Sequence, residues 1–196
     1  AVALALVLDG SGSMNRDFHT QREETARAVE SPQVVEAIQR QGAVAVAVHQ
    51  FATEVRVEVP WQLLRTEADA QQLARAIRSI QFMNGPDTYI SRALNVATHY
   101  FDELDACIPD QQIIDLSTDG VDPGVQQMAD ARDTAQSVGI RINVIAVGQP
   151  EDANVLREYA MTPDGFVLHT VRWSEYASLF RRKIILELAH SSPWSN

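Results

Sequence analysis

Three oxygen-bearing side chains stand at alternate positions in the segment Asp9-Gly10-Ser11-Gly12-Ser13, with a glycine between each pair. The segment directly follows the apolar run Ala1–Leu8, which has the length and composition of a strand buried on both faces. In open α/β sheets, ligands bind just beyond the carboxyl ends of such strands. One carboxylate and two hydroxyls on a tight turn are hard oxygen donors, which suit a small divalent cation and above all Mg²⁺.

Two later loops offer further oxygen donors. Thr88 ends the loop that begins at Asn84 and opens a helix, and Asp119 stands in a Thr-Asp-Gly turn after the apolar strand Ile113–Ser117. In a doubly wound sheet the first and fourth strands are neighbours at the topological switch point. We therefore expect one crevice to hold Asp9, Ser11, Ser13, Thr88 and Asp119. Three hydroxyls and two carboxylates would leave Mg²⁺ under-neutralised, with an exchangeable position for an anionic oxygen from outside.

Strand and helix patterns alternate along the chain, as in βα repeats. Strands are expected at Ala1–Leu8, Ala43–Phe51, Thr53–Val59, Ile113–Ser117, Ile140–Val147 and Phe166–Val171. Helices are expected at Gln33–Gln41, from Thr66 to Ile80, and at Tyr89–Leu104, Val125–Val138 and Ser174–Ala189. The segment Thr53–Val59 alternates polar and apolar residues after a short connection, which indicates an antiparallel edge strand. The pattern predicts an α/β fold: a doubly wound, mostly parallel central sheet with one antiparallel edge strand and helices on both faces.

Length and charge limit the function further. With 196 residues, the chain is expected to form one domain over residues 1–190, followed by a disordered tail at 191–196. A net charge of −10 repels phosphate backbones and disfavours nucleic-acid binding. No apolar run approaches the roughly 20 residues of a membrane span. Cys107 is the only cysteine, which excludes an internal disulfide, and the histidines show no i, i+4 pair, which disfavours zinc.

The five oxygen-bearing residues resemble the metal-ion-dependent adhesion site of von Willebrand factor A domains, the fold of integrin inserted domains. The family's Asp-x-Ser-x-Ser is present as Asp9-Gly10-Ser11-Gly12-Ser13, its threonine matches Thr88, and its aspartate in a Thr-Asp-Gly context matches Asp119. The chain departs from the pattern at Asp87, where small residues are common. An extra carboxylate there could raise cation affinity or weaken the attraction for an acidic partner.

The resemblance implies a single, Rossmann-like von Willebrand factor A domain that is not an enzyme. It implies binding of Mg²⁺, with Mn²⁺ or Ca²⁺ as substitutes, and of a protein partner that presents an Asp or Glu to the metal. Ser11 and Ser13 would hold the ion directly, Thr88 in at least one state, and Asp9 and Asp119 directly or through water. Segments 113–117, 142–147 and 180–183 resemble an uncharacterised bacterial subfamily that is usually exported, which implies a periplasmic or secreted location.

Two other functions remain open, a metal-dependent hydrolase and a metal-free interaction scaffold. Carboxylates with Mg²⁺ at a strand end also serve phosphoryl transfer. Against hydrolysis, none of the three site loops contains a His, Lys or Glu that could act as acid, base or phosphate clamp. The pair Gly10 and Gly12 lacks the third glycine of a dinucleotide fingerprint, because Asn15 occupies that position. No Gly-x-Ser-x-Gly nucleophile elbow is present.

Four further residues have structural interpretations. Asp122 could reach the site from the loop after Asp119, but a solvated loop acid is the favoured interpretation. Asp115 lies inside a buried strand pattern and needs a partner there, which we expect to be an arginine. Trp61 and Trp173 are expected to pack in or around the core.

Overall fold

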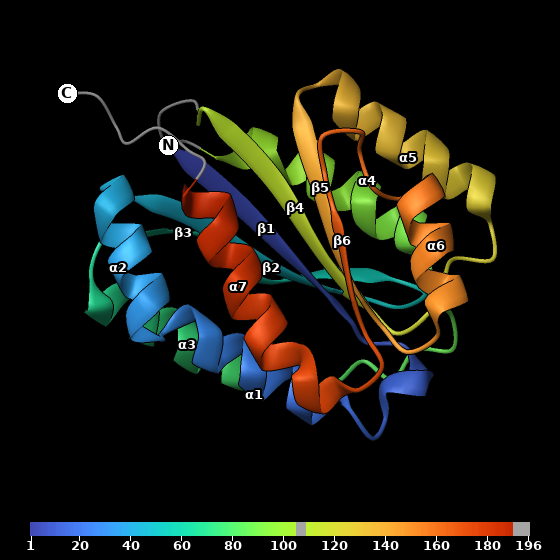
Figure 1. Ribbon diagram of the computed structural model, residues 1–196, viewed down its shortest axis with the longest axis horizontal. Helices are drawn as coiled ribbons and strands as arrows, with labels where there is room; N and C mark the ends of the chain where they lie inside the picture. Colours follow the sequence, from blue (N-terminus) through green and yellow to red (C-terminus); the bar gives the residue numbers. More distant parts are fainter. Residues whose placement is uncertain (105–108, 190–196) are drawn as a thin grey trace.

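A six-stranded sheet in the order β3-β2-β1-β4-β5-β6 runs through the centre of the computed structural model, which describes residues 1–104 and 109–189 (Figure 1). The strands are β1 (Val2–Asp9), β2 (Val44–Phe51), β3 (Val55–Leu64), β4 (Gln111–Thr118), β5 (Ile140–Val147) and β6 (Val167–Thr170). All neighbouring strands are parallel except β2 and β3, which are antiparallel. The expected doubly wound sheet with one antiparallel edge strand is therefore confirmed. Cys107 and the segment 191–196 lie outside the described residues.

Helices cover both faces of the sheet (Figure 1). One face carries α1 (Phe18–Val29), α2 (Pro32–Gln41), α3 (Glu67–Arg78) and α7 (Tyr176–Ala189), and the other carries α4 (Ile90–Tyr100), α5 (Val125–Ser137) and α6 (Pro150–Tyr159). Short 3₁₀ turns occupy Gly12–Met14, Phe101–Glu103 and Trp173–Glu175. None of the helices in the described ranges is both long and apolar enough to span a bilayer.

The alternation of side chains along β1 divides the core into two layers. Leu4, Leu6 and Leu8 pack beneath α1, α2, α3 and α7, whereas Ala3 and Ala5 pack beneath α4 and α5. Every residue of β1 and of β2 is buried, as expected for strands in the middle of a parallel sheet. Burial of each leucine stabilises the fold by roughly 1.5–3 kcal/mol. These two strands thus form a rigid base for the loops at their carboxyl ends.

Two helices were not predicted, and two strands, β3 and β4, are longer than predicted. The buried face of α1 includes Gln21 and Thr25, and α6 buries only Ala153 and Leu156, so neither shows a regular apolar stripe. Strand β3 continues through Pro60 to Leu64, and its pairing with β2 shifts register between Val46 and Val48. Proline is tolerated there because β3 is an edge strand.

A buried ion pair joins α7 to the sheet. The Nζ atom of Lys183 lies 3.0 Å from Oδ1 of Asp115, and both side chains are fully buried. The expectation that an arginine would pair with Asp115 is wrong. Nearby, the Asn143 amide donates to Glu187 at 2.7 Å, and burial together with the negative charge of Asp115 raises the pKa of Glu187 well above its usual range. A lysine at this position suits a compact interior site because its ammonium is a small point charge on a flexible stem.

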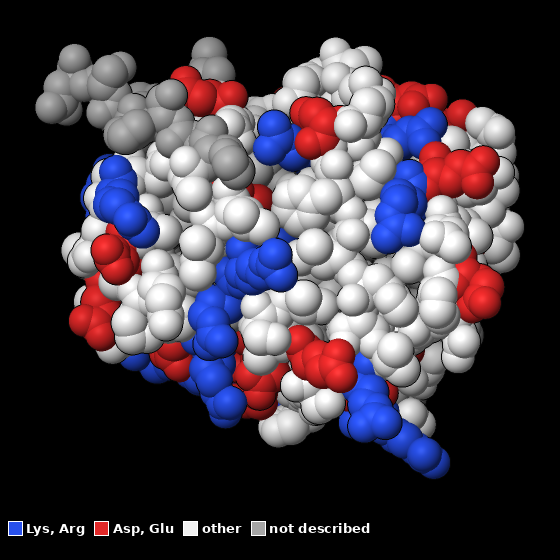
Figure 2. Space-filling view, viewed as in Figure 1, with Lys and Arg blue, Asp and Glu red and all other residues white. Residues whose placement is uncertain are grey.

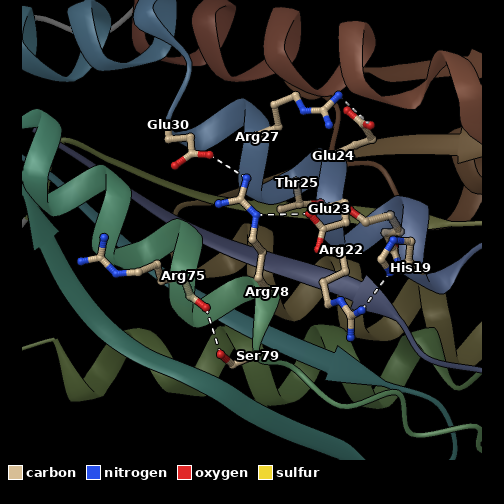
Figure 3. Close-up of polar contacts among 11 residues, drawn as sticks. His19, Arg22, Glu23, Glu24, Thr25, Arg27, Glu30, Arg75, Arg78 and Ser79 are labelled. Carbon is tan, nitrogen blue, oxygen red and sulfur yellow. Dashed lines mark hydrogen bonds and ion pairs between the residues drawn. The ribbon is translucent and has the colours of Figure 1, made fainter.

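A second, half-exposed ion-pair network joins α1 and α3 (Figure 3). Arg78 at the end of α3 donates to Glu30 at 2.6 Å and to Glu23 at 3.2 Å. The start of α3 is fixed separately by a reciprocal capping box between Thr66 and Asp69. Trp61 and Trp173 pack as expected: Trp173 is buried against Tyr176, and Trp61 stacks on Tyr100.

Candidate metal centre

The carboxyl ends of β1 and β4 lie side by side, toward the lower right of Figure 1. Leu8 of β1 pairs with Ser117 of β4, so Asp9 and the turn at Thr118 and Asp119 follow at the same edge. This is the position that the strand order predicts for a ligand site. The two loops are more than one hundred residues apart in sequence, and only the sheet brings them together.

The Asp9 carboxylate is the centre of the hydrogen bonding at this edge, and its residue is fully buried. Its Oδ1 atom accepts the backbone N–H of Ser11 at 2.9 Å and the Ser11 hydroxyl at 2.6 Å. Its Oδ2 atom accepts the Thr118 hydroxyl at 2.8 Å and the N–H of Asp119 at 3.4 Å. One carboxylate therefore ties the first loop to the fourth strand.

Hydroxyl groups continue this chain of contacts to the second carboxylate. The Oγ atoms of Ser11 and Ser13 lie 3.1 Å apart, and the Ser13 hydroxyl donates to Oδ1 of Asp119 at 3.0 Å. Asp9 and Ser11 are buried, Asp119 is half-buried and Ser13 is exposed. Four of the five candidate side chains thus form one connected set that opens to solvent at Ser13.

The fifth candidate, Thr88, is carried by a loop that is bound to the first one. The N–H of Gly12 donates to the carbonyl of Gly85 at 2.7 Å, and the N–H of Gly85 donates to the carbonyl of Gly10 at 3.2 Å. A Cβ at Gly85 would lie 2.5 Å from Cβ of Ala52, just after β2, so any side chain at position 85 would displace Ala52 or this loop. Among the described contacts, the half-buried Thr88 makes none with the other four side chains.

The departure from the family pattern, Asp87, faces a different element. Its Oδ2 atom accepts the Thr53 hydroxyl at 3.0 Å, from the turn between β2 and β3. Beside this turn lies a hollow of about 490 Å³, lined on one side by residues 52–54 and 56 and on the other by Met83, Gly85 and Pro86. Gly85 belongs both to this hollow and to the bridge with Ser11, so the hollow borders the candidate site.

The electrostatics of the connected set favour a cation. Burial and then the negative charge of Asp9 raise the pKa of Asp119 to about 6. A divalent ion between the two carboxylates would remove this repulsion, and carboxylates with hydroxyls are the oxygen donors that Mg²⁺ takes. Within residues 1–104 and 109–189, no three His, Cys, Asp or Glu side chains gather as a metal-binding group, so any site here depends on the serine hydroxyls. The residues present fit Mg²⁺.

Gln21 is a supporting residue that the sequence analysis missed. Its side chain accepts the N–H of Asp9 at 3.2 Å and donates to the carbonyl of Asp9 at 2.9 Å. It is fully buried on α1, a helix that the sequence pattern did not predict. A buried glutamine needs partners for both the oxygen and the NH₂ group of its side-chain amide, and here the end of β1 supplies them.

Asp122 was expected to be a solvated loop acid, and that expectation is wrong. The residue is only 2% exposed. Its Oδ2 atom accepts the N–H of Ser91 at 2.9 Å, and its Oδ1 atom accepts the N–H of Gly124 at 2.8 Å. Asp122 therefore acts on the starts of α4 and α5 and makes no described contact with Asp9 or Asp119.

Comparison with solved structures places the fold. The proximal thread matrix protein 1 of the mussel byssus, in a structure with a zinc-occupied MIDAS motif, superposes with a TM-score of 0.73 and is 24% identical over 96% of this chain and 48% of its own. A von Willebrand factor type A protein from Catenulispora acidiphila gives a TM-score of 0.68 and 22% identity over 95% of this chain and 42% of its own. This chain thus spans about half the length of these two proteins.

A third structure is matched over nearly its whole length. The vWF domain of the type V pili tip protein Mfa5 from Porphyromonas gingivalis gives a TM-score of 0.70 and 11% identity, covering 100% of this chain and 98% of its own. No curated protein matches this chain in sequence. A family model described as "Protein of unknown function (DUF1194)" matches residues 1–192. The chain therefore belongs to that family, and its fold is the fold of von Willebrand factor A domains.

Proposed function

We propose that this domain binds a protein partner through a Mg²⁺ ion held beyond the carboxyl ends of β1 and β4. The observation that carries the proposal is the connected set Asp9, Ser11, Ser13 and Asp119, in which two carboxylates share one hydrogen-bonded group of hydroxyls. Burial, and then the negative charge of Asp9, raises the pKa of Asp119 to about 6. A divalent cation between the two carboxylates would offset their mutual repulsion, which favours its binding.

The residues have distinct roles in this proposal. Ser11 and Ser13 coordinate the ion directly, Asp9 and Asp119 directly or through water, and Thr88 in at least one state. Mn²⁺ and Ca²⁺ can replace Mg²⁺. With two carboxylates and neutral hydroxyls, the ion keeps enough positive character to accept an Asp or Glu carboxylate of the partner. The hollow beside Gly85 gives the residues flanking that carboxylate a place to lie.

The comparisons support this proposal at the level of the fold. The mussel protein holds zinc in a MIDAS motif on the same fold, which supports metal binding as a use of this fold. The Mfa5 domain belongs to a pilus tip protein, which supports an interaction role and a periplasmic or secreted location. We further propose that residues 1–190 form one von Willebrand factor A domain.

We propose a binding function rather than catalysis because the loops of the site carry no His, Lys or Glu, and their carboxylates Asp9 and Asp119 are assigned to the ion. The side chains around Asp9 are hydroxyls from Ser11 and Thr118 and the amide of Gln21. None of these groups titrates near neutral pH. A metal-dependent hydrolase would need such a group, or a metal-bound water placed by one, within reach of the reacting atom.

Calorimetric titration of the purified chain with Mn²⁺ and Mg²⁺ tests the proposal. Asp9→Ala and Asp119→Ala should each abolish binding, while the circular dichroism spectrum should keep its helix and strand content because neither side chain belongs to the apolar core. Asp69→Ala is the matched control: it removes an exposed carboxylate from the start of α3, remote from the site, and should leave affinity unchanged. Undiminished affinity in an Asp9→Ala, Asp119→Ala double variant would reject the site.

Partner binding has its own test. Chelation should abolish capture of a partner, and moderate salt should weaken it only slightly, because charges beyond about 8 Å are screened while the contact at the ion is direct. Figure 2 shows acidic and basic side chains interspersed over one face of the molecule. The negative charge behind the net charge of −10 is therefore not gathered into one acidic patch on that face. Binding that survives a chelator would favour the metal-free scaffold. Metal-dependent hydrolysis of phosphate esters or peptides, lost in Ser11→Ala, would favour the hydrolase.

A further inference from the structure

A single buried carboxylate stands at the start of two helices. Asp122 is 2% exposed, and its two oxygens are directed to different helices. Oδ2 accepts the N–H of Ser91, the second residue of α4, at 2.9 Å. Oδ1 accepts the N–H of Gly124, the residue that precedes α5, at 2.8 Å. Each bond satisfies a backbone donor that the helix itself leaves without an acceptor.

Neither helix has another side chain to do this. The residues at the N-cap positions, Tyr89 and Gly124, make no side-chain capping bond, and the first turns of α4 and α5 contain no acidic residue. By contrast, α3 has its own capping box from Thr66 and Asp69. The negative charge of Asp122 also interacts favourably with the positive ends of both helix dipoles. The starts of α4 and α5 thus depend on one shared anion.

The position of Asp122 in the chain relates this arrangement to the candidate metal site. Asp122 follows Asp119 by three residues, and Ser91 follows Thr88 by three residues. The bond from Ser91 to Asp122 therefore connects the loop that carries Thr88 to the loop that carries Asp119. The other described anchors beside Thr88, at Gly85, Asp87 and Tyr89, lead to the first loop and to the turn between β2 and β3 instead.

We propose that Asp122 is a positioning residue of the metal centre, which fixes Thr88 relative to Asp119 by holding the start of α4. This inference rests on the proposed function, since it assigns Asp122 a role at the same site. Asp122 does not touch the ion; its lone pairs are directed to backbone N–H groups. Residues that orient metal ligands from the next shell typically change metal affinity by about 10–100-fold when they are replaced.

The first measurement compares Mn²⁺ affinity in the full chain and in Asp122→Ala. The expected result is a loss of about 10-fold or more in affinity. Asp122→Asn keeps one acceptor oxygen of the same shape, so it should lose less affinity than Asp122→Ala and serves where the alanine variant folds poorly. Two controls separate positioning from general destabilisation. Asp69→Ala removes a remote helix-capping carboxylate, and Asn143→Ala removes a buried hydrogen-bonding side chain from the middle of β5. Both should keep wild-type Mn²⁺ affinity.

A double-variant cycle with Thr88→Ala identifies the ligand through which Asp122 acts. If Asp122 works by placing Thr88, then Asp122→Ala should weaken Mn²⁺ binding by less than about twofold in a chain that already lacks the Thr88 hydroxyl. If Asp122→Ala instead lowered Mn²⁺ affinity by the same factor with and without the Thr88 hydroxyl, the proposal would be overturned. Unchanged Mn²⁺ affinity in both Asp122→Ala and Asp122→Asn would also overturn it. Absence of Mn²⁺ binding by the unmodified chain would instead overturn the proposed function and this inference together.

Discussion

The Thr118 hydroxyl donates a 2.8 Å hydrogen bond to Oδ2 of Asp9 and so joins the ends of β1 and β4 at the candidate site. Both residues are buried. The other donor to that oxygen is the N–H of Asp119, at the longer distance of 3.4 Å. The orientation of the Asp9 carboxylate therefore depends on a residue that would not itself coordinate the ion.

Replacement of Thr118 by valine should destabilise the fold and weaken Mn²⁺ binding. The substitution removes a hydrogen bond to a buried carboxylate, which is expected to lower the free energy of unfolding by about 1–3 kcal/mol. Urea denaturation in the presence of a chelator measures this. Thr98→Val is the control, because the buried Thr98 hydroxyl has no hydrogen-bond partner among the described residues. That variant should be as stable as the wild type or more stable, and equal losses in both would contradict the argument.

Replacement of Asp119 by asparagine should stabilise the metal-free domain at neutral pH. Burial and the charge of Asp9 raise the folded-state pKa of Asp119 from 3.8 to about 6. The contribution of Asp119 to stability is therefore fully present below about pH 4 and is lost as pH rises through 6. Unfolding measured in chelator from pH 4 to pH 8 should show the wild type becoming less stable than Asp119→Asn only toward higher pH. A difference in unfolding free energy that stays constant with pH would refute the raised pKa of Asp119.

His49 should give the opposite pH dependence. It is fully buried on β2 and packs edge-on against Tyr100, and burial lowers its pKa from 6.5 to about 4. Between these values the unfolded chain binds a proton that the folded chain does not. Stability is therefore fully present above pH 6.5 and should fall by up to about 3 kcal/mol as pH drops to 4. The variant His49→Phe should lose this acid sensitivity, which a comparison of unfolding curves at pH 7 and pH 4.5 would show.

Loss of the buried cation should have a larger effect than loss of a surface one. Lys183→Met leaves the Asp115 carboxylate buried without its ion-pair partner, which should lower the free energy of unfolding by about 3–5 kcal/mol. Arg78→Met breaks two ion pairs, with Glu23 and Glu30, but these side chains are about a third exposed (Figure 3). It should lower that free energy by only about 1 kcal/mol or less per pair. Equal losses would mean that water reaches Asp115.

The sequence predicted the sheet and the meeting of Asp9 with Asp119 because both follow from short-range patterns. The apolar run Ala1–Leu8 identifies a central strand, and the rule that ligands lie beyond carboxyl ends then places Asp9 and Asp119 together. The same patterns could not predict α1, because the burial of Gln21 and Thr25 depends on Asp9 and Tyr176, which are distant in sequence.

Charged residues were harder to predict than apolar ones. The identity of the partner of Asp115 depends on how α7 packs against the sheet. The sequence around Lys183 does not indicate that contact. Asp122 has the composition of an ordinary loop acid, and only the three-dimensional meeting of α4 and α5 explains its burial. In both cases the partner is fixed by packing between elements rather than by local sequence.

The proline within β3 also bears on how copies of this domain meet one another. A sheet edge with a continuous row of free backbone groups is a template for strand addition and aggregation. Here Pro60 removes a donor from the middle of β3, where the register also shifts, and β6 at the opposite edge is only four residues long. Neither border offers the long, regular ladder that a seventh strand would need, so the loops at the carboxyl ends of β1 and β4 are presented on a sheet whose edges disfavour the addition of a strand from another copy.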